Sequence, residues 1–287
     1  AVAEELNFSR AAERLHIAQP PLSMQIRALE EEIKVQLFER DKRRVYLTPA
    51  GMQFLDRARA ILRDVESAKD EVLSAATGQV GRLALGYTAS SMLSPLLPAA
   101  ICRFRQEFPQ VQLSLHEQTS LDQLVAINER RLDLGILRRP HVLIPEGISV
   151  MQWYRSSLLA AIPQGHRLGR APLRMADLDG EVLITYPRDS GIGLYWKVQD
   201  LCAKAAIKAR HMHEIRDVAT MVGLVAAGVG IALVPDGASC IRSDGVVYQK
   251  LLDKEAVSSL YMAYRSAAHN GFTTQMIKLL CEARKDA

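Results

Sequence analysis

Residues 8–51 read FSRAAERLHIAQPPLSMQIRALEEEIKVQLFERDKRRVYLTPAG, and this stretch decides how the first part of the chain folds. Ser9 is a residue type that begins helices, because its hydroxyl can accept a hydrogen bond from a free amide of the first turn. The short segment 16–19 turns the chain sharply. Pro20 and Pro21 then stand where a helix begins and where a missing N–H costs nothing. The stretch therefore predicts two short helices joined by a tight turn.

The second predicted helix has one apolar side. Its apolar residues recur at spacings of four, three and four, which is the period of a helix with one buried face: Leu22, Ile26, Leu29 and Ile33. The other side carries short or polar residues that can lie against base edges and phosphates: Ser23, Gln25, Arg27 and Ala28. This pattern is typical of a helix-turn-helix. An amphipathic pair that only packs against its neighbours is the alternative.

A basic segment follows the second helix directly. Leu37-Phe38 closes the apolar core, and residues 40–44 then hold four basic residues and one acidic residue. Residues 45–47 alternate in the manner of a strand. We interpret this segment as a hairpin, or wing, in which Arg43 and Arg44 reach the DNA backbone or the minor groove. A basic wing beside a helix-turn-helix favours DNA binding over simple packing.

A long helix is predicted next, beginning at Thr48-Pro49. Its apolar residues alternate in threes and fours, as in the seam of a two-stranded helix pair, at positions 55, 58, 62, 65, 68 and 72. Such a helix would span roughly 42 Å at a rise of 1.5 Å per residue. We expect it to hold two chains together as a dimer. A long helix lying on its own domain is the alternative.

Residues 4–51 resemble the winged helix-turn-helix of LysR-type transcriptional regulators. The segments AAERLHIAQPPLSMQIRALEEEIKVQLFER and LTPAG carry the resemblance at the family's spacing. The family begins earlier, so we expect Ala1 to lie inside its first helix. Met24 stands where the family often has arginine, which predicts the loss of one phosphate or base contact. The implied partner is double-stranded DNA, and the candidate contact residues are Ser9, Gln19, Pro20, Pro21, Ser23, Gln25, Arg27, Arg43 and Arg44.

Beyond residue 81 the chain alternates between strand and helix patterns. Short apolar runs predict strands at 83–87, 111–115, 132–137, 158–162, 182–185, 231–234 and 261–264. Helical patterns lie at 93–108, 121–130, 194–206, 218–227 and from 272 onward. Repeated βα units indicate an α/β sheet. The absence of an obvious linker over this length suggests two small lobes joined by crossing strands.

The LysR-type resemblance extends into this region through LDLGIL (132–137) and LVAAGVGIALVP (224–235). It implies a two-lobed α/β effector domain like the type 2 periplasmic-binding proteins. The expected fold class is thus an N-terminal winged helix-turn-helix, all-α with a β wing, then a linker helix and this α/β domain. The expected boundaries are 1–48, 49–77 and 81–287, with lobe I at about 81–155 and 266–287 and lobe II at about 156–265.

Hydroxyl-bearing residues follow several predicted strands, at the edge where open α/β sheets bind ligands and where helix N-termini attract small anions. The candidate effector-binding residues are Thr88, Ser90, Ser91, Thr119, Ser120, Arg138, Tyr186, Ser190, Ile192 and Thr220. Each hydroxyl alone is more simply a helix cap. Arg138 could pair with a carboxylate of a ligand or form a salt bridge between lobes. The resemblance implies effector contacts for Ser90 and Ser120.

AQPPLS and the YP-x-x-SG stretch are similar to regulators of aromatic-compound catabolism. We therefore hypothesise that the effector is a small carboxylate, aromatic or unsaturated. Such a ligand would change the angle between the lobes, and hence the spacing of the DNA-binding heads. The expected partners are DNA, a second copy through the linker helix, further copies in a homotetramer, the effector and RNA polymerase.

The charge, the cysteines and the apolar runs of the chain exclude several classes of protein. The formal net charge of +4 is mild, and residues 1–77 hold 12 basic and 13 acidic residues, so positive charge is local to the wing. The four cysteines have neither a zinc spacing nor a disulfide framework, and buried reduced thiols are expected over a redox pair such as Cys202 with Cys240. The sequence shows no run of 18 apolar residues and no signal peptide, which predicts a cytoplasmic protein without a membrane partner.

Motifs for enzymatic chemistry are absent. Asp189-Ser190-Gly191 is not part of G-x-S-x-G, and Gly228-x-Gly230 lacks a third glycine after a strand. No cofactor, metal ion or catalytic residue is predicted. The competing interpretation is a solute-binding or enzymatic α/β domain whose helical N-terminus makes only protein contacts, and a third is a scaffold that binds neither DNA nor ligand.

Overall fold

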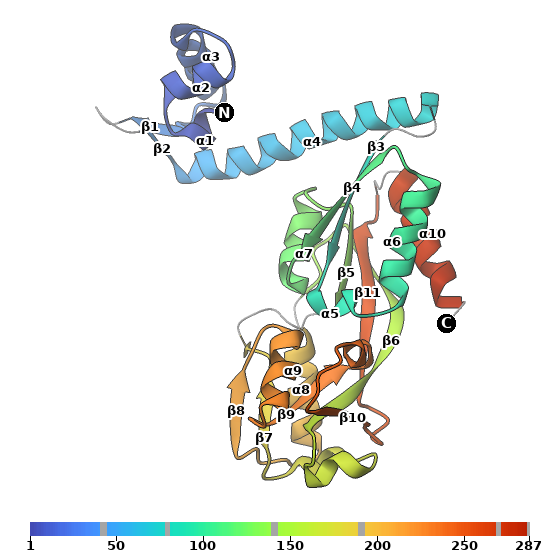
Figure 1. Cartoon of the computed structure of the whole chain (residues 1–287). Helices are drawn as coiled ribbons and strands as arrows, with labels where there is room; N and C mark the ends of the chain where they lie inside the picture. The colour runs from blue at the N-terminus through green and yellow to red at the C-terminus, as the bar shows by residue number, and fades with distance from the viewer. Residues whose placement is uncertain (41–44, 78–80, 139–142, 189–192, 268–270, 286–287) are drawn as a thin grey trace. The chain divides into compact units, whose positions relative to one another are not determined.

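The structure is a computed structural model that describes residues 1–40, 45–77, 81–138, 143–188, 193–267 and 271–285. It consists of two compact units, residues 1–68 and 69–287, and the boundary between them falls within helix α4 (Pro49–Thr77) (Figure 1). Within the described residues, no helix is long and apolar enough to cross a membrane.

The first unit begins with three helices: α1 (Val2–Glu5), α2 (Phe8–Arg14) and α3 (Gln19–Ile33). Asn7, rather than Ser9, caps α2. Its side-chain oxygen accepts hydrogen bonds from the backbone amides of Ser9 and Arg10 at 2.9 and 3.1 Å. The predicted Ser9 cap is therefore wrong, because the helix starts at Phe8, two residues earlier than the start at Arg10 that a Ser9 cap requires.

Helix α3 has the predicted apolar stripe. Pro20 and Pro21 occupy its first turn. The stripe packs with residues of α1, α2 and the wing into one core that contains Val2, Ala11, Ala12, Leu22, Leu37 and Phe38 as its buried members. The helix ends at Lys34, whose φ of 55° is left-handed and turns the chain out of the helix.

The predicted wing is an antiparallel pair, β1 (Phe38–Arg40) with β2 (Val45–Leu47), in which Phe38 pairs with Leu47. Residues 41–44 at its tip, including Arg43 and Arg44, lie outside the described residues. The root of the wing is tight, because a Cβ on Gly51 would lie 2.1 Å from the carbonyl oxygen of Leu37. Only glycine can stand at this position without moving the wing away from α4.

The second unit is built on one sheet with strand order β4-β3-β5-β11-β6-β9-β7-β8, with β10 paired to β6. Its strands are β3 (Gly81–Tyr87), β4 (Val111–Glu117), β5 (Leu134–Arg138), β6 (Ile148–Pro163), β7 (Val182–Thr185), β8 (His211–Glu214), β9 (Ile231–Pro235), β10 (Val246–Lys250) and β11 (Val257–Arg265). Parallel pairs β3–β4, β3–β5, β7–β8 and β7–β9 confirm the predicted βα units. Strands β8 and β10 were not predicted, because HMHE has no apolar run and the apolar run of VVYQK is only three residues long.

Helices cover both faces of this sheet. They are α5 (Ala89–Met92), α6 (Leu96–Glu107), α7 (Ser120–Asn128), α8 (Gly193–Lys204), α9 (Val218–Ala226) and α10 (Gly271–Lys285). On β5, Ile136 packs with the core of α6 and α10, whereas Leu137 packs with that of α7. This alternation places α6 and α10 on one face of the first lobe and α7 on the other. Helices α8 and α9 enclose the separate core of the second lobe.

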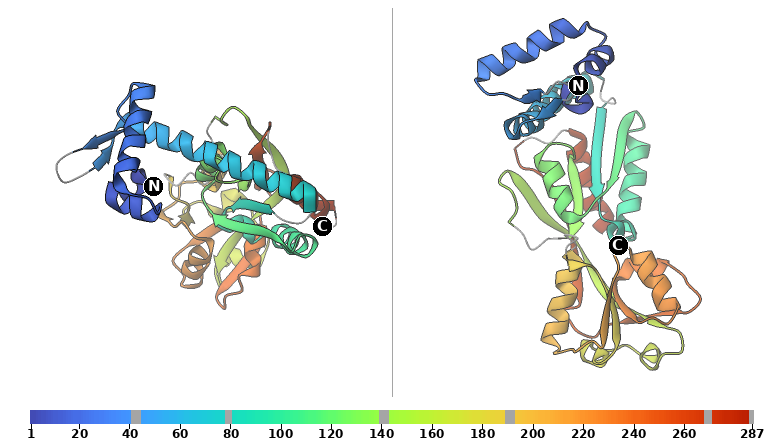
Figure 2. Two further views of the ribbon diagram at one scale, coloured as in Figure 1. Left: turned by 90° about the horizontal axis from the view of Figure 1, so that it is seen from above. Right: turned by 90° about the vertical axis from the view of Figure 1, so that its left-hand side faces the viewer.

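Strands β6 and β11 run from one lobe into the other, as Figures 1 and 2 show. The expected division placed all of 156–265 in the second lobe. The pairing of residues 260–264 with β5 corrects it, since this end of β11 belongs to the first lobe's sheet. The chain thus crosses back near Ser258, whose register partner on β6 is Ser156.

The four cysteines are free thiols, and no disulfide joins them. Cys202 on α8 is buried, and burial raises the pKa of its thiol. Cys102 and Cys240 are exposed and Cys281 is half-buried, so the expectation of buried thiols holds only for Cys202.

Candidate DNA-reading face and effector pocket

The outward side of α3 carries the residues predicted to contact DNA. Gln19, Pro20, Gln25 and Arg27 are exposed, and Pro21 and Ser23 are half-buried. Acidic residues are absent from 19–28 and consecutive at 30–32. The N-terminal part of α3 is therefore the part that can approach phosphates without like-charge repulsion, which agrees with how recognition helices dock.

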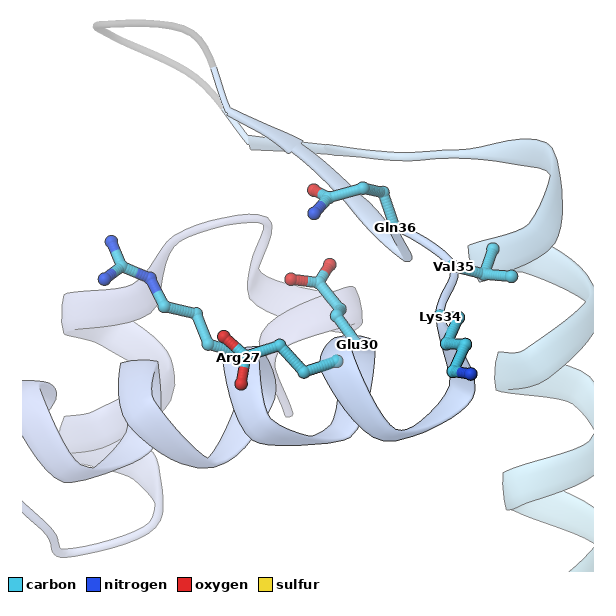
Figure 3. Close-up of a pocket in the computed structure, with 6 residues that line it drawn as sticks. Arg27, Glu30, Lys34, Val35 and Gln36 are labelled. Atoms are coloured by element: carbon cyan, nitrogen blue, oxygen red, sulfur yellow. The ribbon is translucent and has the colours of Figure 1, made fainter.

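A buried carboxylate holds the wing against α3. Oε1 of Glu30 accepts hydrogen bonds from the backbone amides of Leu37 at 2.9 Å and Phe38 at 3.0 Å. Figure 3 shows the Glu30 side chain pointing from α3 toward the segment that leads into the wing. Thr48 completes this junction, because its hydroxyl donates to the carbonyl of Gln36 at 2.8 Å and accepts from the amide of Gly51 at 2.9 Å.

A shallow hollow of about 460 Å³ lies over this junction (Figure 3). It is lined by Arg27, Glu30, Glu31, Lys34, Val35 and Gln36. Its charged groups are exposed apart from Glu30, which already satisfies two amides of the wing root. We therefore assign Glu30 to the architecture of the winged helix rather than to a ligand.

Replacing Glu30 with alanine is expected to lower the melting temperature of the first unit by at least about 10 °C. Two buried amides would lose their acceptor, at about 1–3 kcal/mol each, and about 1 kcal/mol shifts a domain of this size by 4–8 °C. Glu30→Gln retains an acceptor oxygen and should stay close to wild type. Thermal unfolding of the full chain followed by circular dichroism checks this, with Glu31→Ala as the exposed neighbouring control. Equal losses for Glu30→Gln and Glu30→Ala would contradict it.

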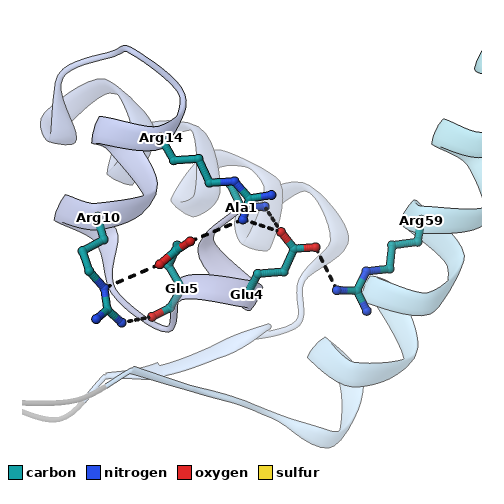
Figure 4. A network of polar contacts seen from close by, with 6 residues as sticks. All are labelled: Ala1, Glu4, Glu5, Arg10, Arg14 and Arg59. Atoms are coloured by element: carbon teal, nitrogen blue, oxygen red, sulfur yellow. Dashed lines mark hydrogen bonds and ion pairs between the residues drawn. The ribbon is translucent and has the colours of Figure 1, made fainter.

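An ion-pair network ties the first helices to α4 within the first unit (Figure 4). Glu4 of α1 lies 2.8 Å from Nη1 of Arg14 on α2 and 2.9 Å from Nη2 of Arg59 on α4. The guanidinium of Arg59, which donates to Glu4, holds the pKa of that carboxyl below its ordinary value. These groups are largely exposed, so solvent screens each pair and its contribution to stability is small. The network therefore makes only a small contribution to the packing of α1, α2 and α4 against one another.

A cavity of about 190 Å³ lies in the second unit, where strand ends from both lobes meet. It is lined by Thr88, Ala89, Ser90, Glu117, Gln118, Thr119, Ser120, Arg138, Tyr186, Gly193, Arg216 and Val218. Most of these residues follow the carboxyl ends of β3, β4, β5, β7 and β8, which is where open α/β sheets hold ligands. The cavity therefore has the position of a small-molecule site.

Arg138 is the buried cation of this cavity. Its Nε donates to Oγ of Ser90 at 3.2 Å, and its Nη1 donates to the carbonyl oxygen and Oγ of Ser258 at 3.1 and 2.9 Å. Burial lowers the pKa of Arg138 to about 10, so the side chain keeps its charge at neutral pH. Its hydrogen-bond partners are neutral oxygens, and no carboxylate of the described residues forms an ion pair with it, although Asp236 attracts the charge from further away. A buried charge of this kind is costly until an anion neutralises it.

Two hydroxyls that face this cavity have no hydrogen-bond partner among the described residues. These are Oγ1 of Thr88 and the phenol oxygen of Tyr186, both buried. Burial also raises the pKa of Tyr186, so its hydroxyl keeps its proton and can donate. Buried polar groups are normally paired. These two hydroxyls, which belong to residues that line the same cavity as Arg138, can therefore form hydrogen bonds to a polar ligand.

The other candidate residues differ in their position. Thr119 and Ser120 line the cavity, but Thr119 caps α7 through Asp122 and Oγ of Ser120 accepts from the backbone amide of Arg138. Ser91 turns its hydroxyl to the backbone of Thr88 and does not line the cavity. Thr220 does not line it either, since Asp217 binds both its amide and its hydroxyl. Ser190 and Ile192 lie outside the described residues.

Four cavity residues of interest were not singled out from the sequence. Glu117 and Gln118 directly precede Thr119 and could have been found by the same strand-end argument. Arg216 and Val218 follow β8, which the sequence did not reveal as a strand. Ser258, which holds Arg138, lies within β11 and gave no signal.

Comparison with known proteins matches both parts of the chain. Residues 1–52 match the bacterial regulatory helix-turn-helix protein family, lysR family, and residues 76–282 match the LysR substrate binding domain. The probable cat1 operon transcriptional activator of Acinetobacter lwoffii is 35% identical over 289 residues, covering 97% of this chain and 92% of that protein.

Two solved structures are similar over large parts of the chain. Full-length CbnR complexed with its target DNA has a TM-score of 0.74 at 25% identity, covering 98% of this chain and 96% of that one. The BenM effector binding domain with its effector benzoate has a TM-score of 0.67 at 25% identity, covering 72% of this chain and 94% of that one. BenM belongs to Acinetobacter baylyi.

Proposed function

Because this chain belongs to the LysR family of bacterial transcriptional regulators, we propose that it switches transcription in response to a small carboxylate bound in the cavity around Arg138. It is a DNA-binding regulator with an effector-binding domain and is not an enzyme, since its relatives are transcriptional regulators. The nature of the effector, the contact residues and the assembly are parts of our proposal.

The observation that carries the effector class is the buried guanidinium of Arg138 without a carboxylate partner. A ligand carboxylate would receive charge-assisted hydrogen bonds from this side chain and from the free hydroxyls of Thr88 and Tyr186. The ring of Tyr186 and the side chain of Val218 offer apolar surface beside it. This combination favours a small organic acid with an aromatic or unsaturated body, a class to which the effector benzoate of BenM belongs.

For DNA, we propose that the N-terminal half of α3 enters the major groove and that the wing contacts the backbone or minor groove. Its acid-free surface, on which Gln19, Pro20, Gln25 and Arg27 are exposed and Ser23 is half-buried, supports this docking. Pro21 would shape the first turn of the helix, and Ser9, exposed at the start of α2, would contact phosphate. We propose that Arg43 and Arg44 make the contacts of the wing with the DNA backbone or the minor groove.

We further propose a homodimer through α4, tetramer formation by the effector domains, and contact with RNA polymerase. Ligand binding in the cavity can change the arrangement of the two lobes. Arg138 belongs to the first lobe and donates hydrogen bonds to Ser258, which lies near the point where β11 crosses between the lobes. A carboxylate that draws Arg138 away from Ser258 would alter this crossing. The resulting change in lobe angle would alter the spacing of the DNA-binding heads.

The test is fluorescence anisotropy of the full-length protein on DNA from beside its own gene, at two salt concentrations and with excess unrelated DNA. We expect tight, salt-sensitive binding that survives the competitor. Candidate carboxylates that bind the cavity should change this affinity, and DNA should change carboxylate affinity by the same factor. Weak binding indifferent to sequence would overturn the docking proposal, and equal carboxylate affinity on and off DNA would overturn the coupling.

A further inference from the structure

Met24 is a large apolar side chain on the outward face of α3, and it is 65% exposed. Single exposed apolar residues are common on soluble proteins. This one, however, stands among the side chains proposed to contact DNA rather than on an ordinary surface. Its position on the helix decides what it can touch.

The helix geometry places Met24 at the middle of the exposed face. Leu22 of the buried stripe lies two residues earlier, and at about 100° per residue Met24 points roughly 200° away from it. Pro20, one turn before, and Ala28, one turn after, share this face and are exposed. Gln25, by contrast, is on the flank of the helix. Among residues 19–28, Met24 is therefore the side chain that projects most directly outward.

The surroundings of Met24 leave it one kind of partner in the groove. Its thioether has no N–H or O–H to donate, so it cannot read the donor and acceptor pattern of a base pair as arginine or glutamine does. Pro20 and Ala28 on either side are likewise without polar side-chain atoms. The apolar group that the major groove offers is the 5-methyl of thymine.

We propose that Met24 reads a thymine through its 5-methyl group, so that each half-site of the operator requires thymine at one position. This inference rests on the proposed docking of α3 in the major groove. An arginine at position 24 would seek guanine or a phosphate. Methionine at this position therefore changes which base is preferred there, in addition to removing the contact that an arginine would make. Met24 is thus a specificity-determining residue of this chain.

The expected effect follows from the area removed from water. Burying one methyl group contributes about 0.8 kcal/mol, which corresponds to roughly fourfold in affinity. A dimer that contacts two half-sites should therefore lose about 15-fold when both methyl groups are removed. Replacing thymine with uracil deletes this methyl and leaves every hydrogen-bonding group of the base unchanged.

The experiment begins with selection of high-affinity duplexes from a random-sequence pool by the full-length protein. Each thymine of the selected duplex is then replaced with uracil, in both half-sites together, and affinity is measured by anisotropy. At one of these positions, uracil should lower the affinity of the wild-type protein for the duplex about 15-fold. Met24→Ala should bind the thymine duplex about 15-fold more weakly and show no further loss with uracil, whereas Met24→Leu should keep most of the thymine preference.

Met52→Ala is the matched control, because Met52 is 53% exposed on α4 of the same unit and lies off the proposed reading helix. It should leave the uracil effect unchanged. If Ser23→Ala and Arg27→Ala weaken binding but Met24→Ala responds to uracil as wild type does, the thymine inference fails and the docking stands. If none of these α3 variants changes sequence-specific binding, the docking of α3 itself fails.

Discussion

Replacing Arg138 with glutamine is expected to lower the affinity for a carboxylate effector by about 100-fold. Removing one partner of a buried, hydrogen-bonded charge pair costs about 2–5 kcal/mol, which is roughly 30-fold to several thousand-fold in affinity. Isothermal titration calorimetry with a panel of small carboxylates headed by benzoate, each paired with its neutral amide, measures the loss. The wild type should prefer the acid, and the variant should lose this preference.

The same substitution should change the stability of the ligand-free protein by only a few degrees. Burial lowers the pKa of Arg138 to about 10. The buried charge therefore destabilises the folded state at every pH below 10. Removing the charge relieves that cost, while the lost hydrogen bonds to Ser90 and Ser258 offset the gain. Thermal unfolding without ligand therefore separates a binding role from a structural one.

Arg216→Gln is the matched control for this prediction. Arg216 also lines the cavity, but it is exposed, so its charge is screened by solvent. Its replacement should weaken carboxylate binding by less than 10-fold. A loss as large as that of Arg138→Gln, or an Arg138 variant that still prefers acid over amide, would assign the anion contact elsewhere. A strong drop in melting temperature with Arg138→Gln would favour the interlobe role considered from the sequence.

Strongly periodic segments could be predicted well from the sequence. The stripe Leu22, Ile26, Leu29 and Ile33 fixed the buried side of α3, and 182–185 is a strand with the predicted bounds. The wing was also found, because alternating residues 45–47 follow an apolar closure at Leu37-Phe38. Strands β8 and β10 were missed, since HMHE has no apolar run and VVYQK has only a short one, and both are strands because they pair with β7 and β6.

The cavity shows where sequence reasoning stops. The rule that ligands bind at strand ends indicated Thr88, Ser90, Ser120, Arg138 and Tyr186, which line it. The rule cannot distinguish a hydroxyl that faces a cavity from one that bonds to its own helix, as those of Ser91 and Thr220 do. Nor can it find a residue such as Ser258, which contacts Arg138 from the beginning of β11, where the strand crosses between the lobes.

Replacing Leu62 with glutamate is expected to convert the protein to a monomer and to weaken operator binding by more than 100-fold. Leu62 is 66% exposed on α4, and Val65, one turn further along the predicted seam, is exposed as well. A buried glutamate at the seam of a dimer would be a charge without a partner. A monomer then binds one half-site, and it forfeits the effective concentration that links the second head to the first.

Ile61→Glu is the control that tests the seam rather than the helix. Ile61 is 62% exposed and adjacent to Leu62, but it points about 100° to one side. Its replacement should leave a dimer at micromolar concentration in sedimentation velocity and should weaken DNA binding far less. Equal effects of both substitutions would place the interface elsewhere on α4. A wild-type chain that sediments as a monomer would favour the alternative in which α4 lies on its own domain, and DNA recognition would then have to arise from a single head.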